Sequence, residues 1–312
     1  MTQRKKSKKH TSRRRRALWA LGAAGVLCAF LLGLWWGTPE PRRPAPKQSV
    51  PRAKPAPQAS TKPAAPKPKV LPPAKPATNQ PDLSRPLVAL VIDDMGYSVA
   101  QAKRLAALGI PLTISILPHS SRAKAVARLA QANGLEVMLH LPMEPKGFPR
   151  RNPGKGVLLC DMPSQRLLKV LQEDLAKVPQ AVGVNNHMGS RFSLYPELLE
   201  CVLLEIKKRG LYYLDSFTSA DSKGLATAQR LGLRTGRRDV FLDHQVSREA
   251  IDEQMLRLMS VAKERGRAIA IGHPHSVTMK ALESWAPRLK QQVSLVKVSE
   301  ILGGPSGSGQ GH

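Results

Sequence analysis

The chain has 312 residues, of which 49 are lysine or arginine and 22 are aspartate or glutamate, so its formal net charge is +27. Three cysteines are too few for a small disulfide-bonded scaffold. A strong positive charge suits acidic polymers, anionic lipids or nucleic acid. The sequence has neither zinc-finger spacing nor interleaved basic and aromatic residues, so we expect no nucleic-acid partner. It indicates no particular protein partner.

The first 36 residues predict a membrane anchor. Residues 1–16 contain nine basic residues and no acid, and residues 17–36 carry no charge. Twenty helical residues at about 1.5 Å each span about 30 Å, the thickness of a bilayer core. The basic flank predicts a cytoplasmic N-terminus and a single-pass anchor in the inner (cytoplasmic) membrane, with the rest of the chain on the periplasmic or cell-wall side. A cleaved signal peptide is the alternative, but the apolar run is longer than usual and no clear cleavage pattern follows it.

Two further segments have the composition of disordered chain. Residues 37–86 are rich in proline, alanine and lysine, and they hold ten basic residues against Glu40 and Asp82. Such a segment buries too little apolar surface to fold, so we predict a Pro-rich linker. Residues 303–312, rich in glycine and serine, are predicted to be a disordered tail. The folded domain is therefore expected to span residues 87–302.

Within that domain, short apolar runs alternate with amphipathic stretches. Eight runs are predicted to be strands, at residues 87–92, 111–117, 135–141, 181–186, 211–214, 239–242, 267–271 and 292–297. Seven stretches are predicted to be helices, at residues 98–108, 120–133, 163–177, 195–209, 219–231, 247–265 and 276–290. The strands are apolar on both faces, which is typical of a parallel sheet covered by helices.

Seven or eight β/α units predict an α/β fold that forms a distorted (β/α) barrel rather than an open, doubly wound sheet. No glycine-rich dinucleotide fingerprint follows the first predicted strand, which argues against a Rossmann fold. Residues 142–162 form a long predicted loop, and long loops in compact domains are often functional. We expect this loop to border the substrate site.

Charged side chains gather where predicted strands end. Asp93 and Asp94 follow the first strand, and His140, His187 and His273 lie at the ends of three later ones. Adjacent carboxylates repel each other and lose hydration at a strand end, so a bound metal or a proton-transfer role would compensate. Strand ends on one face of a barrel converge on one site. The pattern therefore predicts an enzyme.

Six motifs in this order resemble those of the divergent polysaccharide deacetylases, distant relatives of the NodB-type carbohydrate deacetylases. They are residues 90–96 (LVIDDMG), 136–143 (EVMLHLPM), 185–190 (NNHMGS), 214–216 (LDS), 241–243 (FLD) and 272–274 (GHP). The resemblance covers roughly residues 85–302 and implies a distorted, NodB-like (β/α) barrel.

The resemblance also implies roles for the residues at the strand ends. Asp93 would be the general base, and Asp94 and His140 would bind a divalent metal, with zinc as the expected ion. His273 would protonate the leaving group. Independently, amide hydrolysis needs an activated water, a polarised carbonyl and a proton for the nitrogen, which a three-ligand metal site with a carboxylate and an imidazole can supply.

The third metal ligand is open at this point. The usual second motif of the superfamily has two histidines four residues apart, and here Glu144 stands four residues after His140. Either Glu144 or His187 could complete the site, and we favour His187 because histidine is the commoner ligand. If neither binds a metal, the domain would be a catalytically inactive carbohydrate-binding or regulatory module.

Four other residues are candidates for contacts around the site. Asp215 and Asp243 end predicted strands and are expected either to orient a histidine or an arginine, or to serve as structural caps. Arg191 is expected to bind a substrate carboxylate or to pair with Asp215. Asn186 is a candidate for a supporting or substrate contact.

These observations predict a membrane-anchored, metal-dependent hydrolase that removes acetyl groups from a glycan of the cell envelope. The inactive binding module is the alternative. A glycosidase is a third possibility, in which Asp215 or Asp243 would supply the second carboxylate, because adjacent Asp93 and Asp94 are poorly placed to flank a sugar.

Overall fold

The computed structural model describes residues 84–302. The predicted basic N-terminus, membrane anchor, most of the Pro-rich linker and the C-terminal tail lie outside these residues. Among the helices of the described range, none combines the length and the apolar character needed to cross a membrane. The predictions of an anchor and of disorder therefore stay predictions.

All eight predicted strands are present, and the described range contains nine strands in total. They are β1 (Leu87–Met95), β2 (Thr113–Ile116), β3 (Glu136–Met143), β4 (Gly183–Met188), β5 (Tyr212–Asp215), β6 (Thr235–Arg237), β7 (Val240–Phe241), β8 (Arg267–Gly272) and β9 (Ser294–Val296). The helices are α2 (Val99–Ala107), α3 (Ala123–Ala132), α4 (Ser164–Lys177), the short η1 (Phe192–Leu194), α5 (Pro196–Lys208), α6 (Gly224–Arg230), α7 (Arg248–Arg265), α8 (Ser276–Gln292) and α9 (Val298–Ile301). The sequence did not predict β6 and α9, and α6 is shorter than predicted.

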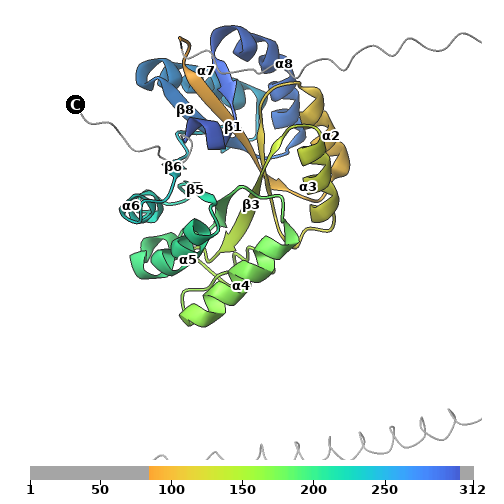
Figure 1. The fold of residues 1–312 in the computed structure, drawn as a ribbon. Coiled ribbons are helices and arrows are strands. Elements are labelled where there is room, and N and C mark those ends of the chain that lie inside the picture. Colours follow the sequence, from red (N-terminus) through yellow and green to blue (C-terminus); the bar gives the residue numbers. More distant parts are fainter. Residues whose placement is uncertain (1–83, 303–312) are drawn as a thin grey trace, which may run out of the picture. The chain divides into compact units, whose positions relative to one another are not determined.

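The strands form one parallel sheet in the order β6-β5-β4-β3-β2-β1-β8-β7, and β9 pairs with the start of β1. The helices surround the curled sheet (Figure 1). Its two ends, β6 and β7, are consecutive in the chain, joined by Arg238 and Asp239. The Arg238 N–H donates to the Asp215 carbonyl, and the Asp239 N–H donates to the Ile269 carbonyl. The backbone thus pairs with β5 up to Arg238 and with β8 from Asp239 onward. The sheet is therefore curled into an incomplete (β/α) barrel, which agrees with the predicted fold class.

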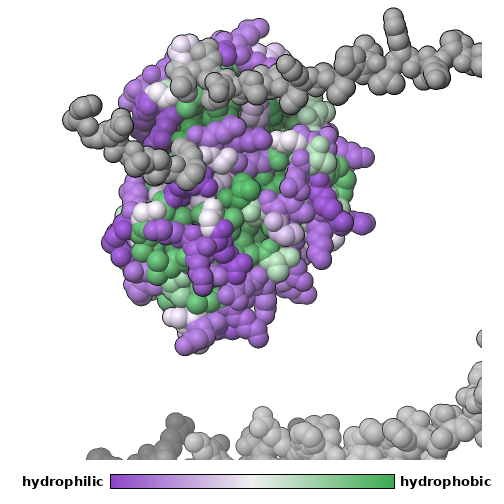
Figure 2. Space-filling model, viewed as in Figure 1, coloured by the Kyte–Doolittle hydropathy of each residue, from purple (hydrophilic) through white to green (hydrophobic). Residues whose placement is uncertain are grey.

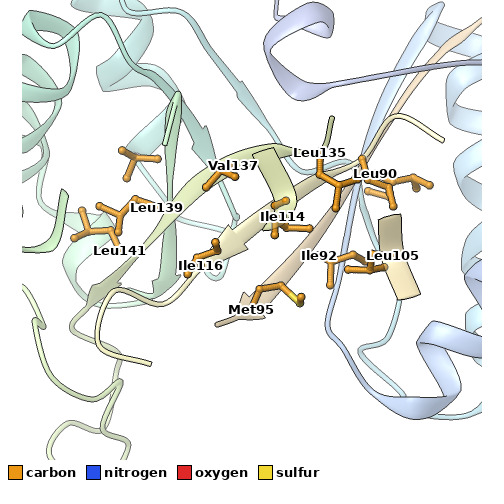
Figure 3. Close-up of a cluster of buried hydrophobic side chains, with 14 of the residues drawn as sticks. Leu90, Ile92, Met95, Leu105, Ile114, Ile116, Leu135, Val137, Leu139 and Leu141 are labelled. Carbon is orange, nitrogen blue, oxygen red and sulfur yellow. The ribbon is translucent and has the colours of Figure 1, made fainter. Parts of the chain in front are cut away.

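Each face of the sheet has its own apolar core. The outer core lies between sheet and helices and includes Leu90, Ile92, Ile114 and Leu139 (Figure 3). The inner core includes Ala89, Val91, Met138, Tyr212, Leu214, Ile269 and Ile271. Since side chains alternate between faces, the inward column of β1 continues from residues 89 and 91 to Asp93, and that of β3 from Met138 to His140. The inner face is therefore apolar toward the amino ends of the strands and polar at their carboxyl ends.

The amino-terminal end of the interior is closed by α9 and by a buried carboxylate. Val298 and Ile301 pack into the inner core. Glu136 Oε1 accepts hydrogen bonds from Thr113 Oγ1 (3.0 Å), Tyr212 Oη (2.7 Å) and the Ser299 N–H (3.1 Å). On the face drawn in Figure 2, hydrophilic residues alternate with apolar patches. A substrate can consequently reach the polar residues from the carboxyl ends of the strands.

Replacing Tyr212 with phenylalanine is expected to destabilise the domain. The change removes one donor from the buried Glu136 carboxylate and should lower the free energy of unfolding by about 1–3 kcal/mol. Urea unfolding followed by circular dichroism measures the effect. Tyr97→Phe is the control, because Tyr97 is 60% exposed. Equal stability of the two variants would contradict the role given to the Glu136 network.

Candidate metal and catalytic site

The adjacent carboxylates face the same side because β1 is irregular at its end. Neighbouring residues of a regular strand point to opposite faces. Here the pairing register with β2 shifts between Ile92 and Met95, and Asp94 has φ of 54°. This left-handed conformation is uncommon outside glycine, although aspartate adopts it more readily than most residues. As a result, both Asp93 and Asp94 approach His140.

Asp94, His140 and His187 form a triad at the carboxyl ends of β1, β3 and β4. Asp94 Oδ1 lies 3.3 Å from His140 Nε2 and 3.0 Å from His187 Nδ1. The two ring nitrogens are 3.1 Å apart. The ligand atoms of all three residues lie within 4.8 Å of one another. The geometry thus brings together the three residues that the sequence predicted as metal ligands, with His187 rather than Glu144 as the third.

This donor set fits a divalent cation. Asp94 Oδ1 is buried and makes no hydrogen bond within the described residues, although it lies between two imidazole nitrogens. Burial would raise the pKa of Asp94, but His140 and His187 outweigh it and hold this pKa below its usual range. Asp94 is therefore a carboxylate. One carboxylate and two imidazoles are ligands that suit zinc and leave room for a water or substrate.

Asn185 connects the general-base candidate to the metal triad. Its Nδ2 donates to Asp93 Oδ1 at 2.8 Å, and its Oδ1 lies 2.8 Å from His140 Nδ1. Since Oδ1 is an acceptor, His140 carries a proton on Nδ1, and Nε2 is the ring nitrogen that faces Asp94. Ser115 Oγ also donates to Asn185 Oδ1. The other Asp93 oxygen, Oδ2, lies 3.6 Å from His140 Nε2, so it faces the centre of the site.

Asp243 orients His273. This role was one of the two alternatives predicted from the sequence for Asp243, the other being a structural cap. His273 Nδ1 lies 2.9 Å from Asp243 Oδ1, and the His273 N–H donates to Asp243 Oδ2. Burial lowers the pKa of His273, but the hydrogen bond to Asp243 and the charges of Asp93, Asp243 and Asp94 outweigh it and raise the pKa to about 9. His273 is therefore protonated at neutral pH, with Nε2 not engaged by Asp243. The register pairs Ile92 with Gly272, which makes Asp93 and His273 neighbours on adjacent strands.

Glu144 and Arg191 form a separate ion pair. Arg191 Nη1 donates to Glu144 Oε1, and the Cys160 N–H donates to Glu144 Oε2 at 2.6 Å. One oxygen of this buried carboxylate thus bonds to the turn after β4, and the other bonds to the long loop. The predicted pairing of Arg191 with Asp215 is wrong, because Arg191 lies beside the end of β3. Glu144 lies outside the metal triad.

Asp215 and Asn186 hold the backbone instead of reaching the site. Asp215 accepts hydrogen bonds from the Phe217 and Leu225 N–H groups and from Ser222 Oγ, so it caps the turn before α6. Asn186 accepts from the Ser216 N–H and donates to the Met188 carbonyl. Strand alternation is the reason: Asn186 points away from the face that carries its neighbours Asn185 and His187.

Sequence reasoning missed Asn185 and Arg238. The alternation of β4 is a signal that could have identified Asn185, since it lies two residues from His187. Half-buried Arg238 donates to the carbonyls of Ser216 and Phe217 at 2.8 and 3.0 Å. Burial lowers its pKa, opposed by the nearby charges of Asp93 and Asp215. No local pattern marks Arg238, because its position depends on the chain crossing from β5 to β8.

Residues 90–302 match the family described as divergent polysaccharide deacetylase. The chain is 34% identical over 218 residues to the uncharacterised protein YibQ of Escherichia coli strain K12, covering 70% of this chain and 68% of that protein. An uncharacterised Haemophilus influenzae protein is 28% identical over 214 residues, or 69% and 76% of the two chains. A crystal structure of an uncharacterised protein from Agrobacterium tumefaciens C58 is similar, with a TM-score of 0.66 and 28% identity over 70% of this chain and 89% of that one. The match spans nearly all of the described domain.

Metal content tests the triad. The wild-type protein, reconstituted with zinc and dialysed, is expected to retain about one ion per chain, whereas Asp94→Ala, His140→Ala and His187→Ala should lose it because each removes one of three ligands. Elemental analysis by mass spectrometry gives the stoichiometry. Glu144→Gln is the matched control and should keep the ion. Loss of zinc in Glu144→Gln with retention in His187→Ala would show that the third ligand is misassigned.

Proposed function

Because the chain belongs to the divergent polysaccharide deacetylase family, we propose that it is a metal-dependent hydrolase that removes acetyl groups from a carbohydrate of the cell envelope. The observation that carries the proposal is the convergence of Asp94, His140 and His187 beside Asp93. A protonated histidine, His273, lies on the neighbouring strand. These groups are the ones that amide or ester hydrolysis requires.

In this mechanism, a divalent ion such as zinc held by Asp94, His140 and His187 would polarise the acetyl carbonyl and lower the pKa of a bound water. Asp93 accepts the proton of the attacking water. Its Oδ1 is fixed by the Asn185 amide, which leaves Oδ2, the oxygen nearer His140, for this transfer. Asn185 therefore positions both the base and a ligand.

His273 supplies the proton that the leaving group needs. Its Nδ1 is held by Asp243, so the proton on Nε2 is the one available for transfer to the nitrogen or oxygen released from the acetyl group. With a pKa raised to about 9, the imidazolium persists at neutral pH until the leaving group demands the proton. Asp243 is thus a positioning residue that acts through His273.

The two alternative functions receive less support. The inactive binding module was motivated by Glu144 standing where the superfamily has a histidine, but His187 lies where a third ligand would be needed. A glycosidase would need a second carboxylate besides Asp93. Asp215 is fully used in capping a turn, and Asp243 is held by His273 and Thr278. Deacetylation therefore remains the function that the site fits best.

We further propose that the domain works on the outer side of the cytoplasmic membrane. The support is the sequence of residues 1–86, in which a basic segment and an uncharged 20-residue run precede a cationic Pro-rich segment. In that arrangement the linker would give the domain reach into the envelope. Protease accessibility of the domain in membrane vesicles of known orientation tests this part of the proposal.

Release of acetate from N-acetylated and O-acetylated oligosaccharides by the zinc-loaded protein tests the activity. Asp93→Asn should lower kcat by about 10²- to 10⁴-fold, because it removes the general base, and should keep the metal. Exposed Asp221→Asn is the control and should match the wild type. Turnover by Asp93→Asn equal to that of the wild type would contradict its role. A zinc-loaded wild type that binds these sugars without releasing acetate would favour the binding module.

The pH dependence of kcat/KM tests the acid. A group with a raised pKa of about 9 is protonated below that pH, so activity should fall as the pH rises through about 9. Asp243→Asn removes the negative charge that helps to raise the pKa of His273. The fall should then move to lower pH, while Asp221→Asn should leave it in place. An unchanged profile in Asp243→Asn would show that another group supplies the proton.

A further inference from the structure

A positively charged pocket lies next to the catalytic segment. It is an open pocket of about 400 Å³ between the loop after β2 and the end of α4. Four permanent cations line it, namely Arg122, Lys124, Arg128 and Lys177, and no acidic residue does so. All four side chains are exposed to solvent and can move toward a ligand. The charged residues that line the pocket are therefore all positive, which favours the binding of an anion.

The wall of this pocket is attached directly to the residues that follow Asp94. The Leu117 N–H donates to the Met95 carbonyl at 3.0 Å, and the Arg122 N–H donates to the Gly96 carbonyl at 2.9 Å. The contact is close, since a Cβ on Gly96 would lie 2.0 Å from Ser120 Oγ. The pocket wall is therefore hydrogen-bonded to the two residues that follow Asp94 in the chain.

The acid behind the pocket does not cancel this charge. Asp174 on α4 is fully buried, and its Oδ1 lies 2.9 Å from His119 Nε2. Burial raises the pKa of Asp174 to about 8, while burial and the charges of Lys177 and Lys155 lower that of His119. Both shifts favour the uncharged forms of Asp174 and His119, so this pair offsets little of the charge of the four cations. Glu173, the neighbouring residue on this helix, does not line the pocket.

The long loop after β3 places one further cation, Lys155, close to the pocket. A Cβ on Gly156 would lie 2.4 Å from Asp174 Oδ1, so the loop packs closely on this carboxyl group. Lys155, the preceding residue, is near enough to lower the pKa of His119. Lys146, Arg150 and Arg151 are exposed elsewhere on the loop. Lys155 therefore adds a cation from a third segment close to the pocket residue His119.

We propose that this pocket binds an anionic group of the glycan, so that the substrate is an acidic polysaccharide rather than a neutral one. This inference rests on the proposed deacetylase function. A carboxylate or a phosphate on a sugar near the acetylated one would pair with the lysines and arginines and hold the acetyl group over the triad. The pocket would then set both the substrate class and the position of the reacting residue.

Binding of three matched probes to the full-length, zinc-loaded chain tests the proposal. The probes are an N-acetylglucosamine tetramer, its carboxymethylated form and its 6-O-phosphorylated form, measured by isothermal titration calorimetry at low and high salt. At low salt the wild type should bind at least one anionic probe about tenfold more tightly than the neutral tetramer, and high salt should reduce the preference. The two anionic probes distinguish a carboxylate from a phosphate.

Two double variants locate the effect. Lys124→Gln with Lys177→Gln should lose most of the preference, whereas Lys103→Gln with Lys263→Gln should keep it. Both pairs remove two exposed lysines, so the net charge of the variants is equal and binding to the basic N-terminal region is the same. Equal losses in the two double variants, or no preference in the wild type, would overturn the inference.

Acetate release from the same probes separates this inference from the proposed function. Turnover of all three probes at equal kcat/KM would overturn the inference and leave the deacetylase function standing. A preference for anionic probes that depends on Lys124 and Lys177, without acetate release, would support the pocket and count against the deacetylase function.

Discussion

The site depends on the close approach of one carboxylate and two imidazoles in a partly buried space. Asp94 Oδ1 and the facing nitrogens of His140 and His187 lie about 3 Å apart, and the oxygen lacks a hydrogen bond among the described residues. A cation at their centre would be bound by the carboxylate oxygen and by a lone pair from each of the two ring nitrogens. The left-handed backbone of Asp94 follows from the same requirement, since without it the carboxylate would point to the other face.

The inside of the curled sheet divides into two zones with different tasks. Near the amino ends of the strands, Tyr212, Met138 and the residues of α9 pack together, and the buried Glu136 has its acceptor oxygen filled by protein donors. Near the carboxyl ends, the inward positions carry Asp93, His140 and Asn185. The apolar zone supplies stability and holds the polar zone rigidly, which allows hydrogen bonds such as that of Asn185 to set the tautomer of a ligand.

Much of this arrangement follows from local sequence patterns. Apolar runs predicted eight strands that the structure contains, and the polar residues at their ends include the three that the structure brings together as a triad. The roles of Asp93 as base and His273 as acid came from the family resemblance and stay predictions. Period-2 alternation would also have assigned Asn185 to the site in place of Asn186, because Asn185 shares a face with His187. The inward turn of Asp94 was not predictable, because it depends on a register shift against β2 rather than on the sequence of β1.

The remaining differences come from short or long-range features. Thr235–Arg237 has three residues and no apolar run, so β6 could be recognised only from its pairing with β5. The four-residue α9 is likewise too short for a helical pattern. Arg191 was expected either to bind a substrate carboxylate or to pair with Asp215, whereas it pairs with Glu144, which lies 47 residues away in sequence and was a rival metal ligand. Choosing between such partners requires the positions of neighbouring strands.

An anomalous-difference map from zinc-soaked crystals, recorded above the zinc absorption edge, tests the metal assignment most directly. A second cluster, Asp243, His273 and His275, offers a rival site within the same structure. We predict one strong peak bounded by Asp94 Oδ1, His140 Nε2 and His187 Nδ1. A peak between Asp243, His273 and His275 instead, or no peak at the triad, would contradict the account.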